Sequence, residues 1–378
     1  METELTEDDI PLMLAEIRRF CQKSVGPLVE RPERTIEAGQ LVRLTEQAWE
    51  IGLINPGVEP GTGLWEDPEC DGWVRLSSGA LCGVGRTNAG IAFHFHQLAL
   101  GRYVSRRLGI DGDRQGIACV QGVYGLARYS LARLLKGADL SDEDRALLHD
   151  YFVTLGSEAE NLPLLFQAAD GWQQLLAPCL DEKGEFGWAA FGREDIEVVP
   201  LPDSHGLDET VTWQWQPRGE SPRQFTAGES ALPLYAKALH INAQALVAIA
   251  LGSLESAYEK AAEYAGLRKQ AGKTISRHAA VRQMLARCAS TIRTVELLRG
   301  QLSRLAVTTN NLGTVFAVRA QAHNLLCAAA NDAMQVLGGS GYSRDAGLEK
   351  IVRDCNHLRL LCGTPDELLM FVSEWEEN

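Results

Sequence analysis

The stretch Gln335-Val-Leu-Gly-Gly-Ser-Gly-Tyr-Ser-Arg-Asp345 is the densest signal in the sequence. It comes directly after residues 314–337, whose apolar side chains recur at helical spacing. Its glycines allow a sharp backbone turn and a close approach to a ligand, and the exposed amide groups of such a turn suit a pyrophosphate. The alternative is a helix C-cap followed by a tight turn. Because no strand precedes the glycines, the stretch does not fit a Rossmann dinucleotide site.

Long amphipathic segments surround this stretch and predict a C-terminal four-helix bundle over residues 228–378. Each segment carries an apolar stripe on one face and charged side chains on the other. The expected helices cover residues 246–258, 281–305, 314–337 and the segment after Pro365. Four antiparallel helices of this kind pack as a bundle.

The two regions before the bundle differ in character. Residues 1–165 predict a helical domain, with helices over residues 6–21, 38–50, 90–108, 125–136 and 141–151, and a loop rich in Gly, Pro and Asp at residues 55–72. Residues 166–227 predict a small, shortened β domain, because short β-rich segments alternate with turn residues. Its strands are expected at residues 172–177, 186–191, 196–201 and 209–215, with a connection at residues 222–228. The expected fold class is mainly α with a small β domain.

The composition excludes several classes of protein. The 378 residues carry a net charge of -14 and a sequence pI of about 5.1, which would repel nucleic acid. The acidic N-terminus does not resemble a secretory signal, and no window approaches the ~20 apolar residues of a membrane span. We therefore expect a cytoplasmic protein without a membrane or nucleic-acid partner.

Metal binding is not expected. The nine cysteines are scattered without metal-ligand spacing, and we interpret them as reduced thiols. His94 and His96 alternate with phenylalanines in a predicted helix, where packing is favoured over metal ligation.

The glycine-rich stretch is part of a longer ordered set in the last third of the chain. The set comprises Gln335, Gly338, Gly339, Gly341, Tyr342, Asp345, Glu349, Lys350, Arg353, Asp354, Gly363 and Thr364. With every spacing intact, it resembles the C-terminal signature of the acyl-CoA dehydrogenases. Residues 264–273 are similar to that family's arginine-containing segment, with Ala271 in place of the usual phenylalanine. The resemblance is strong from about Leu239 to Val372 and fair in the first hundred residues.

This resemblance implies a helical domain, a small β domain and a four-helix bundle, assembled as a dimer of dimers. It also implies FAD, an acyl-CoA thioester substrate, and an electron-transfer flavoprotein or similar acceptor. In the family's reaction a carboxylate removes the α-proton while the β-hydrogen leaves as hydride to the flavin, which gives an enoyl-CoA.

The resemblance also implies roles for individual residues. Carried over by position, Arg268 and Thr364 would contact the phosphate or adenylate part of FAD. Gln335, Gly338 and Gly339 would hold the pyrophosphate of a neighbouring subunit's FAD. Taken alone, Arg268 would be interpreted as a surface cation near a helix end.

The sequence departs from the family pattern at the catalytic base. Cys362 stands before the Gly-Thr pair, where the resemblance places the base, and Asn242 stands at the alternative base position. An amide cannot accept a proton at neutral pH, and a thiol of pKa ~8.5 is a poor base. Asp366 and Glu367 follow the Gly-Thr pair, where the N-terminus of a helix favours acidic side chains, so we interpret them as capping residues. The alternative is that one of them acts as a displaced base. We therefore expect no catalytic residue in this chain. The absence of a general base would lower the rate of conventional dehydrogenation by about 10²–10⁴-fold.

The middle of the chain departs as well. The family's Thr-Glu-Pro strand, Gly-Ser-Asp loop and Gly-x-Lys-x-Trp-Ile-Thr segment, which hold the flavin ring, are not found. The helical residues 125–151 and a shortened set of strands stand in their place.

Three hypotheses follow. In the first, the chain is a subunit of a heteromeric acyl-CoA dehydrogenase, similar to the α2β2 assemblies of bacterial steroid side-chain degradation, and a homologous partner supplies the base. In the second, it is an independent flavoenzyme that uses Cys362, Asp366 or an elimination from an acyl-CoA. In the third, it binds acyl-CoA or assists assembly without catalysis.

Overall fold

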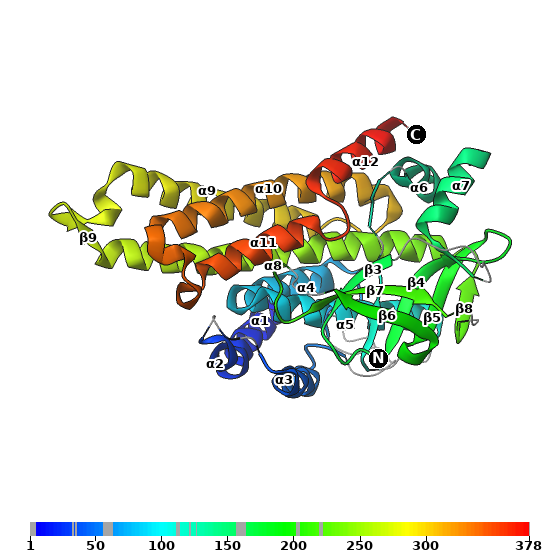
Figure 1. The fold of residues 1–378 in the computed structure, drawn as a ribbon, viewed down its shortest axis with the longest axis horizontal. Coiled ribbons are helices and arrows are strands. Elements are labelled where there is room, and N and C mark those ends of the chain that lie inside the picture. Colours follow the sequence, from blue (N-terminus) through cyan, green and yellow to red (C-terminus); the bar gives the residue numbers. More distant parts are fainter. Residues whose placement is uncertain are drawn as a thin grey trace.

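The longest helix, α8 (Ala231–Leu267), runs through the molecule and organises the elements around it (Figure 1). It packs against α4 and α5 of the N-terminal region and against α9, α10 and α11 of the C-terminal region. The computed structural model describes residues 5–31, 34, 36–55, 63–110, 114–120, 122–125, 127–155, 164–201, 205–218 and 222–377.

Helix α8 corrects one expectation from the sequence. By length and composition it could cross a bilayer, although we expected no window to approach such a span. However, 94% of its most apolar window is buried inside the protein, as in the core helix of a globular domain. Its apolar character therefore follows from being surrounded by other helices.

The C-terminal bundle follows the predicted segments and adds a helix. Its helices after α8 are α9 (Ala279–Leu302), α10 (Leu312–Val336), α11 (Leu348–Leu360) and α12 (Pro365–Glu377). A small hairpin of β9 (Lys269–Gln270) and β10 (Lys273–Thr274) joins α8 to α9. The glycine-rich stretch forms a 3-10 turn, Gly338–Tyr342, in which Gly338 adopts a left-handed φ of 59° just after α10. This is the position and conformation of a C-cap glycine.

The N-terminal region is helical, as expected. Its helices are α1 (Asp9–Phe20), the π-helical turn Cys21–Val25, α2 (Gly26–Val29), α3 (Ala38–Glu50), α4 (Asp71–Thr87), α5 (Ala89–Leu108), α6 (Ala127–Lys136) and α7 (Asp142–Tyr151). Helix α4 was not predicted, because its four glycines weaken the helical signal. One partner explains part of this composition: a Cβ atom on Gly85 of α4 would lie 2.6 Å from the Ile249 carbonyl oxygen of α8, so the two helices touch backbone to backbone.

Strands β1 to β8 form two sheets beside one end of α8, away from the β9–β10 hairpin (Figure 1). The first sheet has the order β1 (Gly116–Ala118), β4 (Gln174–Leu180), β5 (Phe186–Gly192), β8 (Gln224–Ala227), and β2 (Val153–Thr154) also pairs with β4. The second has the order β3 (Leu164–Ala168), β7 (Val211–Pro217), β6 (Ile196–Leu201).

The β region is richer than predicted. Four of the strands correspond to the expected ones, and four short strands, β1, β2, β3 and β8, were missed. The expected connection at residues 222–228 contains β8, which pairs antiparallel with β5. Strands this short carry little periodicity of their own and are stabilised by pairing with residues distant in sequence.

Candidate functional site

A chain of hydrogen bonds joins four side chains at the centre of the molecule. The indole N–H of Trp65 donates to Nδ1 of His96 at 3.0 Å, and His96 Nε2 lies 3.0 Å from Oδ1 of Asn242. The Asn242 amide donates to the Cys362 sulfur at 3.1 Å, and the thiol in turn donates to the Val120 carbonyl at 3.1 Å. The structure thus brings together Asn242 and Cys362, the two residues that the sequence places at base positions.

The chemistry of its members fixes the direction of this chain. An indole nitrogen only donates, so His96 Nδ1 accepts and its proton sits on Nε2, which donates to the Asn242 oxygen. That oxygen assignment turns the amide nitrogen of Asn242 toward Cys362. The Cys362 thiol then donates its own hydrogen bond to the Val120 carbonyl oxygen. Hydrogen bonds aligned in one direction polarise and reinforce one another.

Burial keeps the chain neutral. It lowers the pKa of His96 to about 4, against the smaller opposing effect of the Asn242 hydrogen bond. It also raises the pKa of the Cys362 thiol, and the nearby Arg319 charge and the Asn242 amide only partly oppose this rise. Among the described residues, no carboxylate hydrogen-bonds to Asn242 or Cys362. At neutral pH the arrangement offers a thiol and an amide, neither of which is a competent base.

The backbone at Cys362 is held in an uncommon conformation. Its φ of 57° lies in the left-handed region, which costs a non-glycine residue roughly 1–2 kcal/mol. The buried guanidinium of Arg319 on α10 donates to the carbonyl of Leu361 and, at 3.4 Å, to that of Cys362. Arg319 therefore fixes the turn that aims the Cys362 side chain at Asn242.

The segment after β1 covers this site. A Cβ atom on Gly122 would lie 2.2 Å from the Cα atom of Cys362, so the two backbones are in direct contact. The amide of Val123 donates to the Cys362 carbonyl at 3.4 Å, and the amide of Gly125 donates to Glu367 at 3.4 Å. Helices α6 and α7 follow, where the family resemblance implies flavin-ring segments. The part of the chain that the structure describes thus covers one side of the site with its own backbone, and Cys362 stays partly exposed.

The remaining acidic candidates cap a helix. Thr364 and Glu367 form a reciprocal box at the start of α12: the Thr364 amide and hydroxyl donate to Glu367 Oε2 at 2.9 and 3.0 Å, and the Glu367 amide donates back at 3.2 Å. Asp366 is exposed in the same turn. Thr364 therefore has its hydroxyl engaged within its own chain.

The other predicted cofactor residues lie at the far end of the bundle. Arg319 contacts the Cys362 turn, and Gln335 lies sixteen residues further along α10, about 24 Å at the rise of an α-helix. Likewise Asn242 and the end of α8 at Arg268 are about 38 Å apart. The structure therefore separates Arg268, Gln335, Gly338 and Gly339 from Cys362 within one chain.

This distal turn fits a bound phosphate group better than the Cys362 site fits a flavin. A Cβ atom at Gly338 or Gly339 would have no heavy atom within 4 Å, so their backbone is open on the outer side. Gln335 is exposed, and its side-chain oxygen accepts from Tyr342 at 3.3 Å. Such a turn can admit a pyrophosphate from outside the chain, whereas Gly122 fills the space against Cys362.

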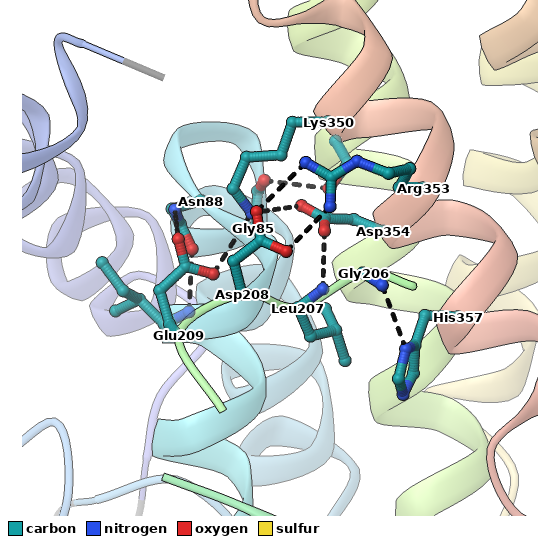
Figure 2. Close-up of polar contacts among 12 residues, drawn as sticks. Gly85, Asn88, Gly206, Leu207, Asp208, Glu209, Lys350, Arg353, Asp354 and His357 are labelled. Atoms are coloured by element: carbon teal, nitrogen blue, oxygen red, sulfur yellow. Dashed lines mark hydrogen bonds and ion pairs between the residues drawn. The ribbon is translucent and has the colours of Figure 1, made fainter. Parts of the chain in front are cut away.

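An ionic cluster joins α11 to the loop before β7 (Figure 2). Lys350 bridges Asp354 at 2.9 Å and Glu209 at 3.2 Å, and Arg353 pairs with Asp208 at 2.7 Å. The neighbouring carboxylates outweigh burial and raise the pKa of Lys350. All these charges are used in pairs that connect the β region to the bundle, so the cluster is structural.

Sequence reasoning missed Trp65, Val120 and Arg319 as members of the site. His96 was favoured as a packing residue, whereas the structure gives it two side-chain hydrogen bonds. No group of metal-ligating side chains exists among the described residues. One signal was available: a histidine on an otherwise apolar helix requires polar partners when it is buried.

Comparison with known structures first defines the class of protein. The chain superposes on a glutaryl-CoA dehydrogenase in complex with glutaryl-CoA with a TM-score of 0.73 at 16% identity, covering 99% of this chain and 96% of that one. It also superposes on an acyl-CoA dehydrogenase from Bacillus anthracis complexed with FAD with a TM-score of 0.72 at 18% identity, covering 98% and 67%. The chain therefore has the acyl-CoA dehydrogenase fold.

Sequence comparison then shows which part of the chain is similar to a known family. Residues 232–376 match the family model of the acyl-CoA dehydrogenase C-terminal domain. The 3-sulfinopropanoyl-CoA desulfinase of Paraburkholderia xenovorans (strain LB400) is 33% identical over 120 residues, which make up 31% of this chain and 30% of that protein. The chain thus matches about a third of the length of its curated relatives. Its C-terminal region, residues 232–376, is therefore similar to the C-terminal domain of the acyl-CoA dehydrogenases.

Proposed function

We propose that this chain is a subunit of a heteromeric, FAD-dependent acyl-CoA dehydrogenase, in which a homologous partner supplies the catalytic base. One observation carries the proposal: the two positions at which the family resemblance places a carboxylate hold Asn242 and Cys362, and they are hydrogen-bonded to each other. A site that is neutral and covered by Gly122 cannot remove an α-proton from a thioester.

The surviving family features support a role beside a partner. The open turn at Gly338 and Gly339, with Gln335 next to it, would hold the pyrophosphate of FAD bound mainly by the partner chain. When bound, FAD accepts the substrate's β-hydrogen as hydride. This chain's own part is to bind the cofactor's phosphates and to complete the partner's site. We place the acyl group among the steroid side chains and the electron acceptor among the electron-transfer flavoproteins, on the resemblance alone.

A spectrum of the complex tests this proposal. The chain is expressed alone and together with a homologous acyl-CoA dehydrogenase chain encoded nearby. We expect no flavin absorbance near 450 nm from the chain alone, and a yellow, active complex containing both chains after co-expression. An active, yellow assembly of this chain alone would refute the proposal.

Two matched variants locate the cofactor contact. Gly338→Ala strains a left-handed glycine in the open turn, and Gly109→Ala, at a left-handed glycine in equally open space after α5, is its control. We expect Gly338→Ala to lower the flavin content of the complex and Gly109→Ala to leave it unchanged. Equal flavin content in both variants would contradict the assignment of the turn.

A second candidate is the desulfination of a sulfinoacyl-CoA, in which the C–S bond breaks, sulfur leaves as sulfite and water supplies the proton left on carbon, so that no α-proton has to be removed. It is favoured by the similarity to a relative described as a desulfinase that acts on a CoA thioester. Turnover of 3-sulfinopropanoyl-CoA by the chain alone, with the flavin retained, would support this candidate over the accessory subunit. Calorimetric binding of an acyl-CoA without turnover by either preparation would instead support a purely binding role.

A further inference from the structure

The N-terminal region contains an apolar cavity of about 450 Å³, and neither Cys362 nor Asn242 contributes to its lining. It lies between α1, the turn after α3, and the face of α4 that carries Leu76 and Ala80. Its floor consists of buried apolar side chains: Ile17, Phe20, Leu53, Leu64, Leu76 and Ala80. A volume of this size with an apolar lining is typical of small-molecule sites.

The rim of this cavity is charged and carries a net positive charge. Glu16, Arg19 and Lys23 line it, and Glu16 pairs with Arg19 at 2.7 Å. Lys23 makes no ion pair within the described part of the chain. One positive charge is therefore left over at the rim, in a protein whose net charge is -14.

The backbone at the rim is unusual. Residues Cys21–Val25 form a π-helical turn that closes with a bond from the Gly26 amide to the Cys21 carbonyl. The wider turn inserts a residue between α1 and α2, and such insertions occur frequently at functional sites. Lys23 and Ser24 of this turn both line the cavity. On the other side of the opening, Ile51 is 51% exposed and extends the apolar wall.

We propose that this cavity binds an anionic amphiphile, a carboxylate with an aliphatic body, whose tail packs on Leu76 and Ala80 and whose carboxylate lies beside Lys23. The apolar floor selects the tail, because each buried methylene group contributes about fourfold in affinity. The unpaired charge selects the head group. The inference does not rest on the proposed function, since the cavity is separate from the Cys362 site.

Calorimetry of the full chain with decanoate, below its critical micelle concentration, tests the inference. We expect one saturable site per chain, octanoate binding weaker by about fifteenfold because two methylenes are lost, and decylammonium binding weaker than decanoate. Lys23→Glu should reverse the preference between the two head groups. Its control is Arg18→Glu on the preceding helix α1, since Arg18 lines a different, charged groove.

Two filling variants identify the site. Ala80→Leu fills the floor and should weaken decanoate binding at least tenfold, and Ile51→Trp narrows the opening from the exposed side if Ala80→Leu fails to fold. Circular dichroism and thermal unfolding confirm that each variant is folded. Absence of saturable decanoate binding, or unchanged affinity in a folded filling variant, would overturn the inference whatever the result for the flavin complex.

Discussion

Replacing Asn242 with leucine tests whether the hydrogen-bond chain is a cooperative unit. The variant removes the acceptor of the His96 Nε2–H, and His96 cannot change tautomer because the Trp65 N–H occupies Nδ1. A buried donor is then left without a partner, which costs about 1–3 kcal/mol, and the bond to the Cys362 sulfur is lost as well. We expect the free energy of unfolding to fall by about 2–4 kcal/mol.

A double-mutant cycle with His96→Leu makes the test quantitative. His96→Leu alone leaves two groups unpaired, the Trp65 N–H and the Asn242 oxygen, whereas Asn242→Leu alone leaves one. The double variant leaves only the Trp65 N–H. The losses in unfolding free energy of the two single variants should therefore add up to about 2 kcal/mol more than the loss of the double variant. Urea unfolding followed by circular dichroism and tryptophan fluorescence measures these losses. Additivity within about 0.5 kcal/mol would refute a directed chain.

Three further predictions concern other parts of the molecule. Lys350→Met leaves two buried carboxylates without their cation and should lower the free energy of unfolding by about 3–5 kcal/mol. Gly122→Ala places a Cβ atom against the Cys362 backbone and should displace the covering segment, so that iodoacetamide modifies Cys362 faster, as measured by peptide mass spectrometry. Because the pKa of His96 is about 4 in the folded protein and about 6.5 when unfolded, the stability it contributes is complete above pH 6.5. That stability is lost toward pH 4 at up to about 1.4 kcal/mol per pH unit, and His96→Leu should remove one proton from this pH dependence of unfolding.

Matched variants control these measurements. Arg287→Ala removes a more exposed ion pair between α9 and α10 and should cost less than about 1 kcal/mol. Gly83→Ala on α4 meets no heavy atom within 4 Å and should leave the labelling of Cys362 unchanged. A small effect of Lys350→Met, unchanged labelling in Gly122→Ala, or an unchanged proton number in His96→Leu would each contradict the corresponding assignment.

The helices and longer strands were readable from the sequence because their signal is local. Helix α3 has the predicted bounds, and strand β6 occupies the predicted residues 196–201. Helix α4 was missed because its four glycines weaken the helical signal, and the backbone contact of one of them, Gly85, with Ile249 of α8 is visible only in the tertiary structure. The expected connection at residues 222–228 contains β8, because this short strand is stabilised by pairing with β5, which the local sequence does not show.

Only part of the candidate site could be predicted from the sequence. The family resemblance singled out both Cys362 and Asn242, but nothing in the sequence showed that they touch. Trp65, His96 and Val120 come from three other segments, and no short-range pattern connects them. The distal position of Gln335 and Gly338 was implied only through a neighbouring subunit. A hydrogen-bond network between residues that are distant in sequence produces no local pattern, so the sequence shows only isolated polar residues without an evident role.

The neutral side chains at positions 362 and 242 and the backbone that covers them are physically linked. A carboxylate at position 362 or 242 would be charged at neutral pH, and burying it beneath Gly122 would cost several kcal/mol of desolvation. A thiol and an amide can be buried there because each satisfies the other, with His96 and Val120 completing their hydrogen bonds. The hydrogen-bonded Asn242–Cys362 pair therefore stabilises the chain at the positions where the family resemblance places the base, which supports the proposal of a subunit whose partner performs the reaction.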